Sequence, residues 1–159
     1  MPQIYFAHGA LDGQSGHDAG WALLKKLYDQ YVGGQMPPIS IESGGKPYFA
    51  DSPWHFSISH TKRHAFCVLS DVPVGIDGEE LSRKVSHLLA EKALSKAEQE
   101  QYRQAKDKNK ALLTFWVLKE AQGKCNGKGI GIHPNHTNFS LTDDRVFECD
   151  GCLVAIVYE

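Results

Sequence analysis

The sequence has no excess of either charge and no long apolar run, and each of these shortages excludes a class of protein. Its 17 Lys and Arg residues nearly balance its 19 Asp and Glu residues, giving a net charge of −2. A balance of this kind offers no electrostatic basis for binding nucleic acid. No segment approaches the length of a membrane span, and the first residues carry no basic, apolar leader. We therefore expect a cytoplasmic protein that binds neither nucleic acid nor membranes.

Cysteine is also scarce, and two of the four cysteines form the short motif "CDGC", at Cys149 and Cys152. The motif is compatible with a redox pair or half of a zinc site, but no second ligand pair has the matching spacing. Asp150-Gly151 is a strong two-residue hairpin turn between two β-type segments. We therefore interpret the two cysteines as the flanks of a hairpin turn, with a disulfide across it as the alternative.

What is present indicates one α+β domain with its own core, since 42% of the 159 residues are hydrophobic. Helical spacing predicts a helix capped by Asp18 and ended by Gly33, and another helix from about Ser82 to Leu94. Ser95 and Glu98 form a capping-box pattern that opens a further helix. The segment from 110 to 125 is the longest amphipathic helix, and the tail predicts antiparallel strands.

A weak internal repeat links the two ends of the chain. The segment that begins at Trp21 resembles the one that begins at Trp116, and a Gly-Lys pair precedes "FSISH" much as another precedes "FSLTD". Two related halves, 1–73 and 74–159, would account for this pattern, although chance remains an alternative.

Three acidic side chains, two on a predicted strand and one on a predicted helix, are candidate metal ligands. Asp77 and Glu79 end an apolar run with only Gly78 between them, so their side chains share one face of a strand. Glu120 and Lys124 are four residues apart, and so share one face of the long helix. Each pair alone is compatible with a solvated strand end or an exposed ion pair. Together the three carboxylates are hard oxygen ligands of the kind that Mg²⁺ prefers.

Candidate donors for phosphate oxygens lie in two other segments. Lys46 follows two glycines in "GGKP", while Ser59 and His60 end the strand "FSISH" before a turn. With Lys124 they would surround an anionic ligand, and a divalent cation between carboxylates and phosphates would neutralise both. This combination is typical of phosphoryl-transfer chemistry. The remaining histidines, including the "HPNH" segment at His133 and His136, lack partners spaced for zinc, and we expect no zinc site there.

Three motifs in order, "GKPYF", "FSISHTKRHAFCVLSDVPVGIDGE" and "FWVLKEAQGKCNGKGI", resemble the 4'-phosphopantetheinyl transferases of the larger, surfactin-synthetase-activating type. The resemblance covers the chain from about residue 44 to residue 131. It implies an α+β fold of two pseudo-twofold-related halves, the N-terminal half contacting the phosphates of coenzyme A and the C-terminal half carrying the metal and catalytic residues. It also implies a Mg²⁺-dependent enzyme, with Mn²⁺ as a possible substitute, that transfers the phosphopantetheine arm of coenzyme A to a serine of an acyl or peptidyl carrier protein and releases 3',5'-ADP.

The resemblance also implies a role for each candidate residue. Asp77, Glu79 and Glu120 would bind the metal, Glu120 would also be the base for the carrier serine, and Lys124 would assist the departing 3',5'-ADP. The coenzyme A contacts would be Lys46, Ser59 and His60. Two departures from the family pattern are Gly78, where the family usually has a bulky apolar residue, and the absence of Lys or Arg before residue 25. Two other functions therefore stay open, a non-catalytic binder of coenzyme A or carrier protein and a Mg²⁺-dependent phosphohydrolase. Two fused halves favour a monomer.

Overall fold

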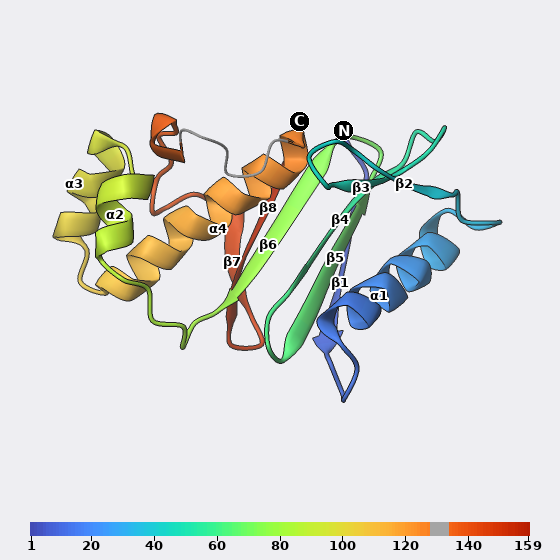
Figure 1. Ribbon diagram of the computed structural model, residues 1–159, viewed down its shortest axis with the longest axis horizontal. Helices are drawn as coiled ribbons and strands as arrows, with labels where there is room; N and C mark the ends of the chain where they lie inside the picture. The colour runs from blue at the N-terminus through green and yellow to red at the C-terminus, as the bar shows by residue number, and fades with distance from the viewer. Residues whose placement is uncertain (128–133) are drawn as a thin grey trace.

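Two three-stranded antiparallel sheets, each covered by one long helix, make up most of the computed structural model, which describes residues 1–127 and 134–159 (Figure 1). In the first sheet the strand order is β1-β5-β4, and in the second it is β6-β8-β7. The elements are β1 (Ile4–Ala10), α1 (Gly16–Tyr31), β2 (Ile39–Ile41), β3 (Pro47–Phe49), β4 (His55–His60), β5 (His64–Ser70), β6 (Val74–Glu80), α2 (Leu88–Ala93), α3 (Lys96–Gln104), α4 (Lys108–Asn126), the 3₁₀ turn Pro134–His136, β7 (Val146–Cys149) and β8 (Cys152–Tyr158). The predicted α+β class with small antiparallel sheets is confirmed.

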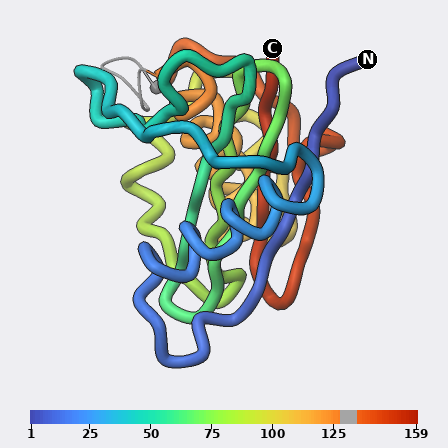
Figure 2. The backbone as a smooth tube through the Cα atoms, turned by 90° about the vertical axis from the view of Figure 1, so that its right-hand side faces the viewer, coloured from blue at the N-terminus to red at the C-terminus, as the bar shows by residue number. Residues whose placement is uncertain are grey.

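The helices lie on different sheets. Helix α1 packs on β1, β4 and β5, whereas α4 packs on β6 and β8. Figure 2 views the molecule from the α1 side and shows this helix crossing in front of its sheet. The short β2–β3 hairpin lies at the same end of the molecule as the two chain termini (Figures 1 and 2).

Strands β4 and β6 bring the two sheets together without a backbone ladder between them. Instead, the hydroxyl oxygens of Ser57 and Ser59 on β4 accept hydrogen bonds from the backbone N–H groups of Ile76 and Gly78 on β6, each at 3.1 Å. Behind this junction a buried apolar cluster joins β5, β6 and β8. The alternating serines therefore hold two sheet edges in a defined register.

Most predicted helix and turn signals are confirmed. The Ser95 capping box is present, and the long helix begins after Asp107 and ends at Gly127, whose φ of 75° is the left-handed conformation that glycine adopts freely. Asp150 and Gly151 both have positive φ, as a two-residue hairpin turn requires.

Two helix starts were predicted at the wrong residue. The cap of α1 is Ser15, whose hydroxyl accepts the backbone N–H of Asp18, so Asp18 lies in the first turn and not at the cap. The predicted helix from Ser82 shrinks to Leu88–Ala93. The residues before it form no regular helix, and the side chain of Asn109 bonds the carbonyl of Arg83 and the N–H of Val85 there. A tertiary contact has overridden local helix propensity there.

No helix in the described ranges, 1–127 and 134–159, combines the length and apolarity needed to cross a membrane.

Candidate functional site

Asp77 lies at the centre of the candidate site, buried where β6 faces β4 and α4. The sequence suggested a strand end, but β6 continues to Glu80 and pairs with β8 over its whole length. Asp77 Oδ1 lies 3.4 Å from both Ser59 Oγ and Lys124 Nζ. Its other oxygen, Oδ2, is buried and receives no hydrogen bond from any described residue.

The environment of Asp77 works against its negative charge. Burial raises the pKa of this carboxyl to about 7, the neighbouring Glu120 and Glu79 add to the shift, and Lys124 opposes it. Burial, followed by repulsion from Glu79, likewise raises the pKa of Glu120, against the attraction of Lys124 and Arg83. The three carboxylates therefore sense one another electrostatically, and a cation among them would relieve the repulsion.

The structure brings these carboxylates near one another but does not close them into one cluster. Glu79 turns toward Arg83, whose Nη1 lies 2.5 Å from Glu79 Oε1. In the described part of the chain, the groups of three or more ligand atoms lying within 4.8 Å of one another do not include these three carboxylates. Convergence on one ion would therefore require Glu79 to leave Arg83.

Helix α4 carries Glu120 and Lys124 to Asp77 because it approaches β6 very closely. A Cβ atom placed on Gly75 would lie 1.9 Å from the carbonyl oxygen of Ala121, so only glycine permits this contact. At this distance Lys124 Nζ donates to the carbonyl of Ile76 at 2.9 Å and to that of Ile58 at 3.2 Å. The amine is thus held by both strands at the junction of the sheets.

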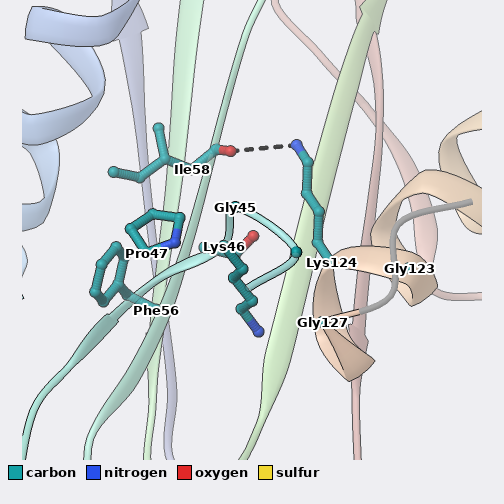
Figure 3. Close-up of a pocket in the computed structure, with 10 residues that line it drawn as sticks. Gly45, Lys46, Pro47, Phe56, Ile58, Gly123, Lys124 and Gly127 are labelled. Atoms are coloured by element: carbon teal, nitrogen blue, oxygen red, sulfur yellow. Dashed lines mark hydrogen bonds between the residues drawn. The ribbon is translucent and has the colours of Figure 1, made fainter. Parts of the chain in front are cut away.

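Lys46 and Lys124 line one cavity of about 250 Å³ between the β2–β3 hairpin, β4 and the end of α4 (Figure 3). Their amino groups point to opposite ends of it (Figure 3). Lys46 Nζ lies 3.4 Å from the carbonyl oxygens of Val74 and Cys125, the latter in the last turn of α4, where a cation is favoured. Burial lowers the pKa of Lys46, against the attraction of nearby acidic groups.

Ser59 and His60 occupy different surroundings, although they are adjacent in sequence. Ser59 is buried and points inward to Asp77 and the backbone of Gly78, whereas His60 is exposed at the end of β4 with its ring against Gly16, at the start of α1. His60 lines a second, larger cavity of about 690 Å³, together with Thr61, Lys62, Glu79, Glu80, Ser82, Arg83 and Lys84. The three predicted coenzyme A contacts are therefore not brought to a single cavity.

Sequence reasoning missed two residues that build the site. Ser57 bonds β6 just as Ser59 does, and the alternation of serines in "FSIS" was the available signal. Gly75 inside an apolar strand indicates a close backbone approach, and the structure shows one. The last residues of the third motif, 128–130, and His133 lie outside the described residues.

The donor set fits a hard divalent cation. All three candidate ligands are carboxylates, and the buried Oδ2 of Asp77 is an acceptor that no described group satisfies. Lys124, held beside Asp77, supplies positive charge to the cavity that it lines together with Lys46. Carboxylates next to fixed amines are suited to hold a cation against phosphate oxygens.

Comparison with known proteins agrees with this chemistry. Residues 73–153 match the family model of the 4'-phosphopantetheinyl transferase superfamily. The chain is 37% identical over 94 residues to the 4'-phosphopantetheinyl transferase gsp of Aneurinibacillus migulanus, covering 57% of this chain and 38% of the relative. It is 33% identical over 130 residues to the 4'-phosphopantetheinyl transferase psf-1 of Bacillus pumilus, covering 79% of this chain and 55% of the relative. It is 34% identical over 123 residues to the 4'-phosphopantetheinyl transferase HetI of Nostoc sp., covering 70% of this chain and 52% of the relative.

The chain thus spans about half the length, or less, of the curated relatives that it matches. The family match runs from β6 to the start of β8 and includes Asp77, Glu79, Glu120 and Lys124. The chain belongs to the 4'-phosphopantetheinyl transferase superfamily.

Proposed function

We propose that this chain transfers the 4'-phosphopantetheine arm of coenzyme A to a serine of an acyl or peptidyl carrier protein. The observation that supports this most directly is the buried, unsatisfied Oδ2 of Asp77 beside Lys124 and Glu120. A structural carboxylate would be expected to have both oxygens satisfied. Three relatives named as transferases of this group lend further support.

Glu120 is proposed as the base for the carrier serine. A serine hydroxyl is a weak nucleophile until a neighbouring group accepts its proton. The raised pKa of Glu120 makes it a stronger base than an ordinary carboxylate, and its half-buried position leaves it reachable. The serine oxygen forms a new bond to the phosphorus that carries the pantetheine arm. The bond from that phosphorus to the oxygen of 3',5'-ADP breaks, and the proton goes to Glu120.

Asp77, Glu79 and Glu120 are proposed as the ligands of Mg²⁺, with Mn²⁺ as a possible substitute. The bound ion would screen the pyrophosphate charge as the phosphorus–oxygen bond breaks. Asp77 would offer its free Oδ2, whereas Glu79 would first exchange its ion pair with Arg83 for the metal.

Lys124 is proposed to neutralise the departing 3',5'-ADP. We expect Lys124→Ala to lower kcat about 100- to 1000-fold and to change the Kd for coenzyme A much less, because the charge on the leaving oxygen develops only in the transition state. Steady-state kinetics and calorimetric coenzyme A binding measure the two effects. Lys25→Ala, on the surface of α1, is the matched control. A loss confined to binding would show that Lys124 does not act on the leaving group.

The pH dependence of stability tests the burial of Asp77 directly. The pKa of Asp77 in the folded chain is about 7, above its ordinary value of 3.8, so the folded state binds more protons than the unfolded state between these values. The free energy of unfolding of the metal-free protein should therefore fall as pH rises from about 4 to 7. Urea denaturation across this range measures it, and Asp77→Asn should flatten the slope. An unchanged slope in the variant would contradict the shift.

Bound Mg²⁺ should restore the stability that the metal-free protein loses as pH rises. The ion binds the carboxylate form and only the folded state assembles the site, so adding Mg²⁺ at pH 8 should raise the melting temperature. Asp77→Asn should abolish most of this rise, whereas removal of Mg²⁺ with a chelator should restore the metal-free value. A rise of equal size in the variant would place the bound Mg²⁺ elsewhere.

Lys46 and His60 are proposed as contacts to the phosphates of coenzyme A, from the two cavities that flank β4. Because Ser59 points to Asp77, we propose that it acts on the ligand indirectly, by holding Asp77 in place.

The finer architecture is part of the same proposal. We infer that residues 1–73 and 74–159 are pseudo-twofold-related halves, because in each sheet the first strand in sequence lies at one edge and the last lies in the centre. In the first half α1, and in the second half α2, α3 and α4, lie between that first strand and a later antiparallel pair. We expect the chain to act as a cytoplasmic monomer.

Mass spectrometry of a carrier protein tests the function. The full chain is incubated with apo carrier protein, coenzyme A and Mg²⁺, and a mass gain equal to the phosphopantetheine arm on the carrier serine supports transfer. Bound coenzyme A with no gain on any carrier would instead indicate a non-catalytic binder. Release of 3',5'-ADP without a carrier would indicate a phosphohydrolase.

A further inference from the structure

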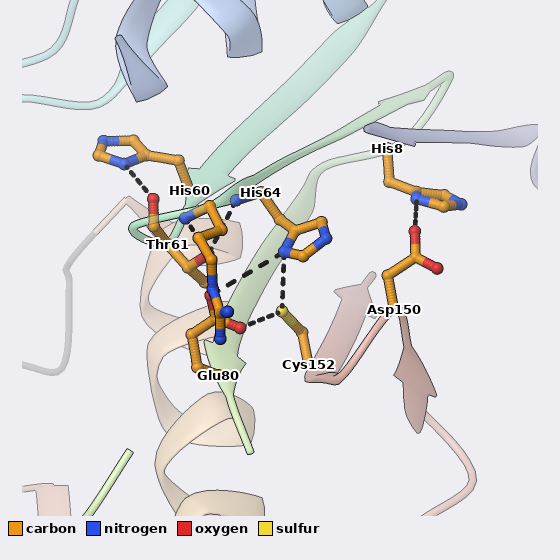
Figure 4. Close-up of polar contacts among 8 residues, drawn as sticks. His8, His60, Thr61, His64, Glu80, Asp150 and Cys152 are labelled. Carbon is orange, nitrogen blue, oxygen red and sulfur yellow. Dashed lines mark hydrogen bonds and ion pairs between the residues drawn. The ribbon is translucent and has the colours of Figure 1, made fainter. Parts of the chain in front are cut away.

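A second polar cluster, apart from the carboxylates described above, lies at the far end of β6. His64, Glu80 and Cys152 place one ligand atom each within 4.8 Å of one another (Figure 4). Cys152 Sγ donates to Glu80 Oε2 at 3.1 Å and lies 3.7 Å from His64 Nδ1, which is 3.9 Å from Glu80 Oε1. The three residues come from β5, β6 and β8, so this cluster links the two sheets.

The cluster is enclosed. Cys152 is fully buried, and the side chains of His64 and Glu80 are 18% and 12% exposed. A carboxylate is rarely buried without a partner, and here it joins an imidazole and a thiol in a mixed nitrogen, oxygen and sulfur donor set. Zinc is bound by these donor types, in tetrahedral geometry.

The observed spacing matches that geometry. Zinc–ligand distances of about 2.0–2.3 Å in a tetrahedron place neighbouring ligand atoms about 3.3–3.7 Å apart. Cys152 Sγ lies 3.1 Å from Glu80 Oε2 and 3.7 Å from His64 Nδ1, close to this range, and one ligand atom of each residue lies within 4.8 Å of the other two. We propose that His64, Glu80 and Cys152 form a binding site for a thiophilic divalent cation, Zn²⁺, with three protein ligands.

The surroundings supply what a metal site also requires, a second layer of hydrogen bonds and a route of entry. Thr61 Oγ1 and Arg63 Nε each donate to Glu80 Oε1 at 3.2 Å, which leaves Oε2 directed at Cys152. Glu80 also lines the cavity of about 690 Å³ described above, through which an ion can enter. On binding, the thiol proton now donated to Glu80 leaves to solvent, and the sulfur binds as thiolate.

This site is distinct from the proposed magnesium site. Glu79 and Glu80 are adjacent on β6, so their side chains leave opposite faces of the sheet. The sulfur and nitrogen donors select zinc over magnesium, whereas the all-carboxylate set selects the reverse. The two sites should therefore bind their ions independently.

A neighbouring group, His8, Cys149 and Asp150, is the competing location. His8 Nδ1 lies 3.2 Å from Asp150 Oδ2, but these side chains are 37% and 56% exposed. An exposed carboxylate–imidazole pair is common without a metal. Cys149 pairs with Cys152 across the hairpin, so variants of these two cysteines separate the alternatives.

Cobalt reports directly on sulfur ligation. The full chain, stripped of metal with a chelator and kept reduced, is titrated with Co²⁺ without coenzyme A. We expect one equivalent to produce the thiolate-to-cobalt charge-transfer band and tetrahedral visible bands, and Zn²⁺ to abolish both while excess Mg²⁺ does not. Absence of the charge-transfer band in the wild-type protein would overturn the proposal, whether or not the chain transfers phosphopantetheine.

Variants then assign the ligands. Cys152→Ser, His64→Gln and Glu80→Gln should each weaken Zn²⁺ binding roughly 100-fold, whereas Thr61→Val should weaken it about 10-fold through the hydrogen bond to Glu80. The matched control Cys149→Ser should retain the cobalt bands, as should Asp77→Asn. Loss of the bands in Cys149→Ser with retention in Cys152→Ser would place the ion at the neighbouring group and reject this site.

Discussion

Asp77→Asn is expected to lower the rate of phosphopantetheine transfer about 1000-fold or more while the protein stays folded. Asparagine has nearly the same shape but lacks the charge that would hold the cation against the pyrophosphate. Loss of a metal ligand removes several kcal/mol of transition-state stabilisation, and each 1.4 kcal/mol is tenfold in rate. The assay is the mass gain of a carrier protein over time at saturating coenzyme A and Mg²⁺.

The same substitution should leave the metal-free protein equally stable or more stable. The pKa of Asp77 is about 7 in the folded chain, so at pH 8 the fold bears the cost of a buried charge that asparagine does not carry. We expect the free energy of unfolding at pH 8 to rise by about 1–3 kcal/mol. Asp71→Asn is the matched control, because Asp71 is exposed at the turn before β6 and should change neither property. A variant that unfolds, or one that keeps full activity, would contradict the role given to Asp77.

Local signals predicted much of the fold. The helix now seen as α4, the capping box of α3 and the hairpin at Asp150-Gly151 depend on neighbours in sequence, and all three are confirmed. The helix predicted from Ser82 was wrong in its first part, because the side chain of Asn109 bonds the backbone there from 24 or more residues away. Long-range contacts of this kind have no local pattern in a single sequence.

The sequence predicted which residues form the candidate site better than it predicted how their side chains are arranged. Asp77, Glu120 and Lys124 come together as expected, since one strand and one helix face carry them. Ser59 and His60 diverge, because neighbours on a strand point to opposite faces. The pairing of Glu79 with Arg83 is a choice of rotamer that spacing along the chain does not determine.

The cluster of His64, Glu80 and Cys152 could not be predicted from the sequence. The "CDGC" motif lacked a second ligand pair in sequence, and in the structure Cys152 contacts His64 and Glu80, 88 and 72 residues before it. Antiparallel pairing of β6 with β8 brings Glu80 opposite Cys152, and packing of β5 on this sheet adds His64. Strand register, which follows from the whole fold, therefore creates the cluster.

Gly75→Ala is expected to destabilise the protein by at least about 3 kcal/mol, the upper part of the range for overpacking. The added methyl group would lie 1.9 Å from the carbonyl oxygen of Ala121 and 2.5 Å from the backbone nitrogen of Cys125. Both are backbone atoms of α4, so no side-chain rotation relieves the overlap, and the helix must move away from β6. Urea denaturation monitored by circular dichroism gives the free energy of unfolding.

A displaced helix should also impair the chemistry, because the approach of α4 to β6 is what sets Lys124 Nζ at 2.9 Å from the carbonyl of Ile76 and 3.4 Å from Asp77 Oδ1. At temperatures where Gly75→Ala remains folded, kcat should therefore fall at least about 10-fold, since small displacements of catalytic groups are costly. Gly9→Ala is the matched control, a glycine in β1 around which a Cβ atom would meet nothing within 4 Å. Its stability should change by less than about 0.5 kcal/mol. If Gly75→Ala were as stable and active as Gly9→Ala, the close contact between α4 and β6 would not be what positions Lys124.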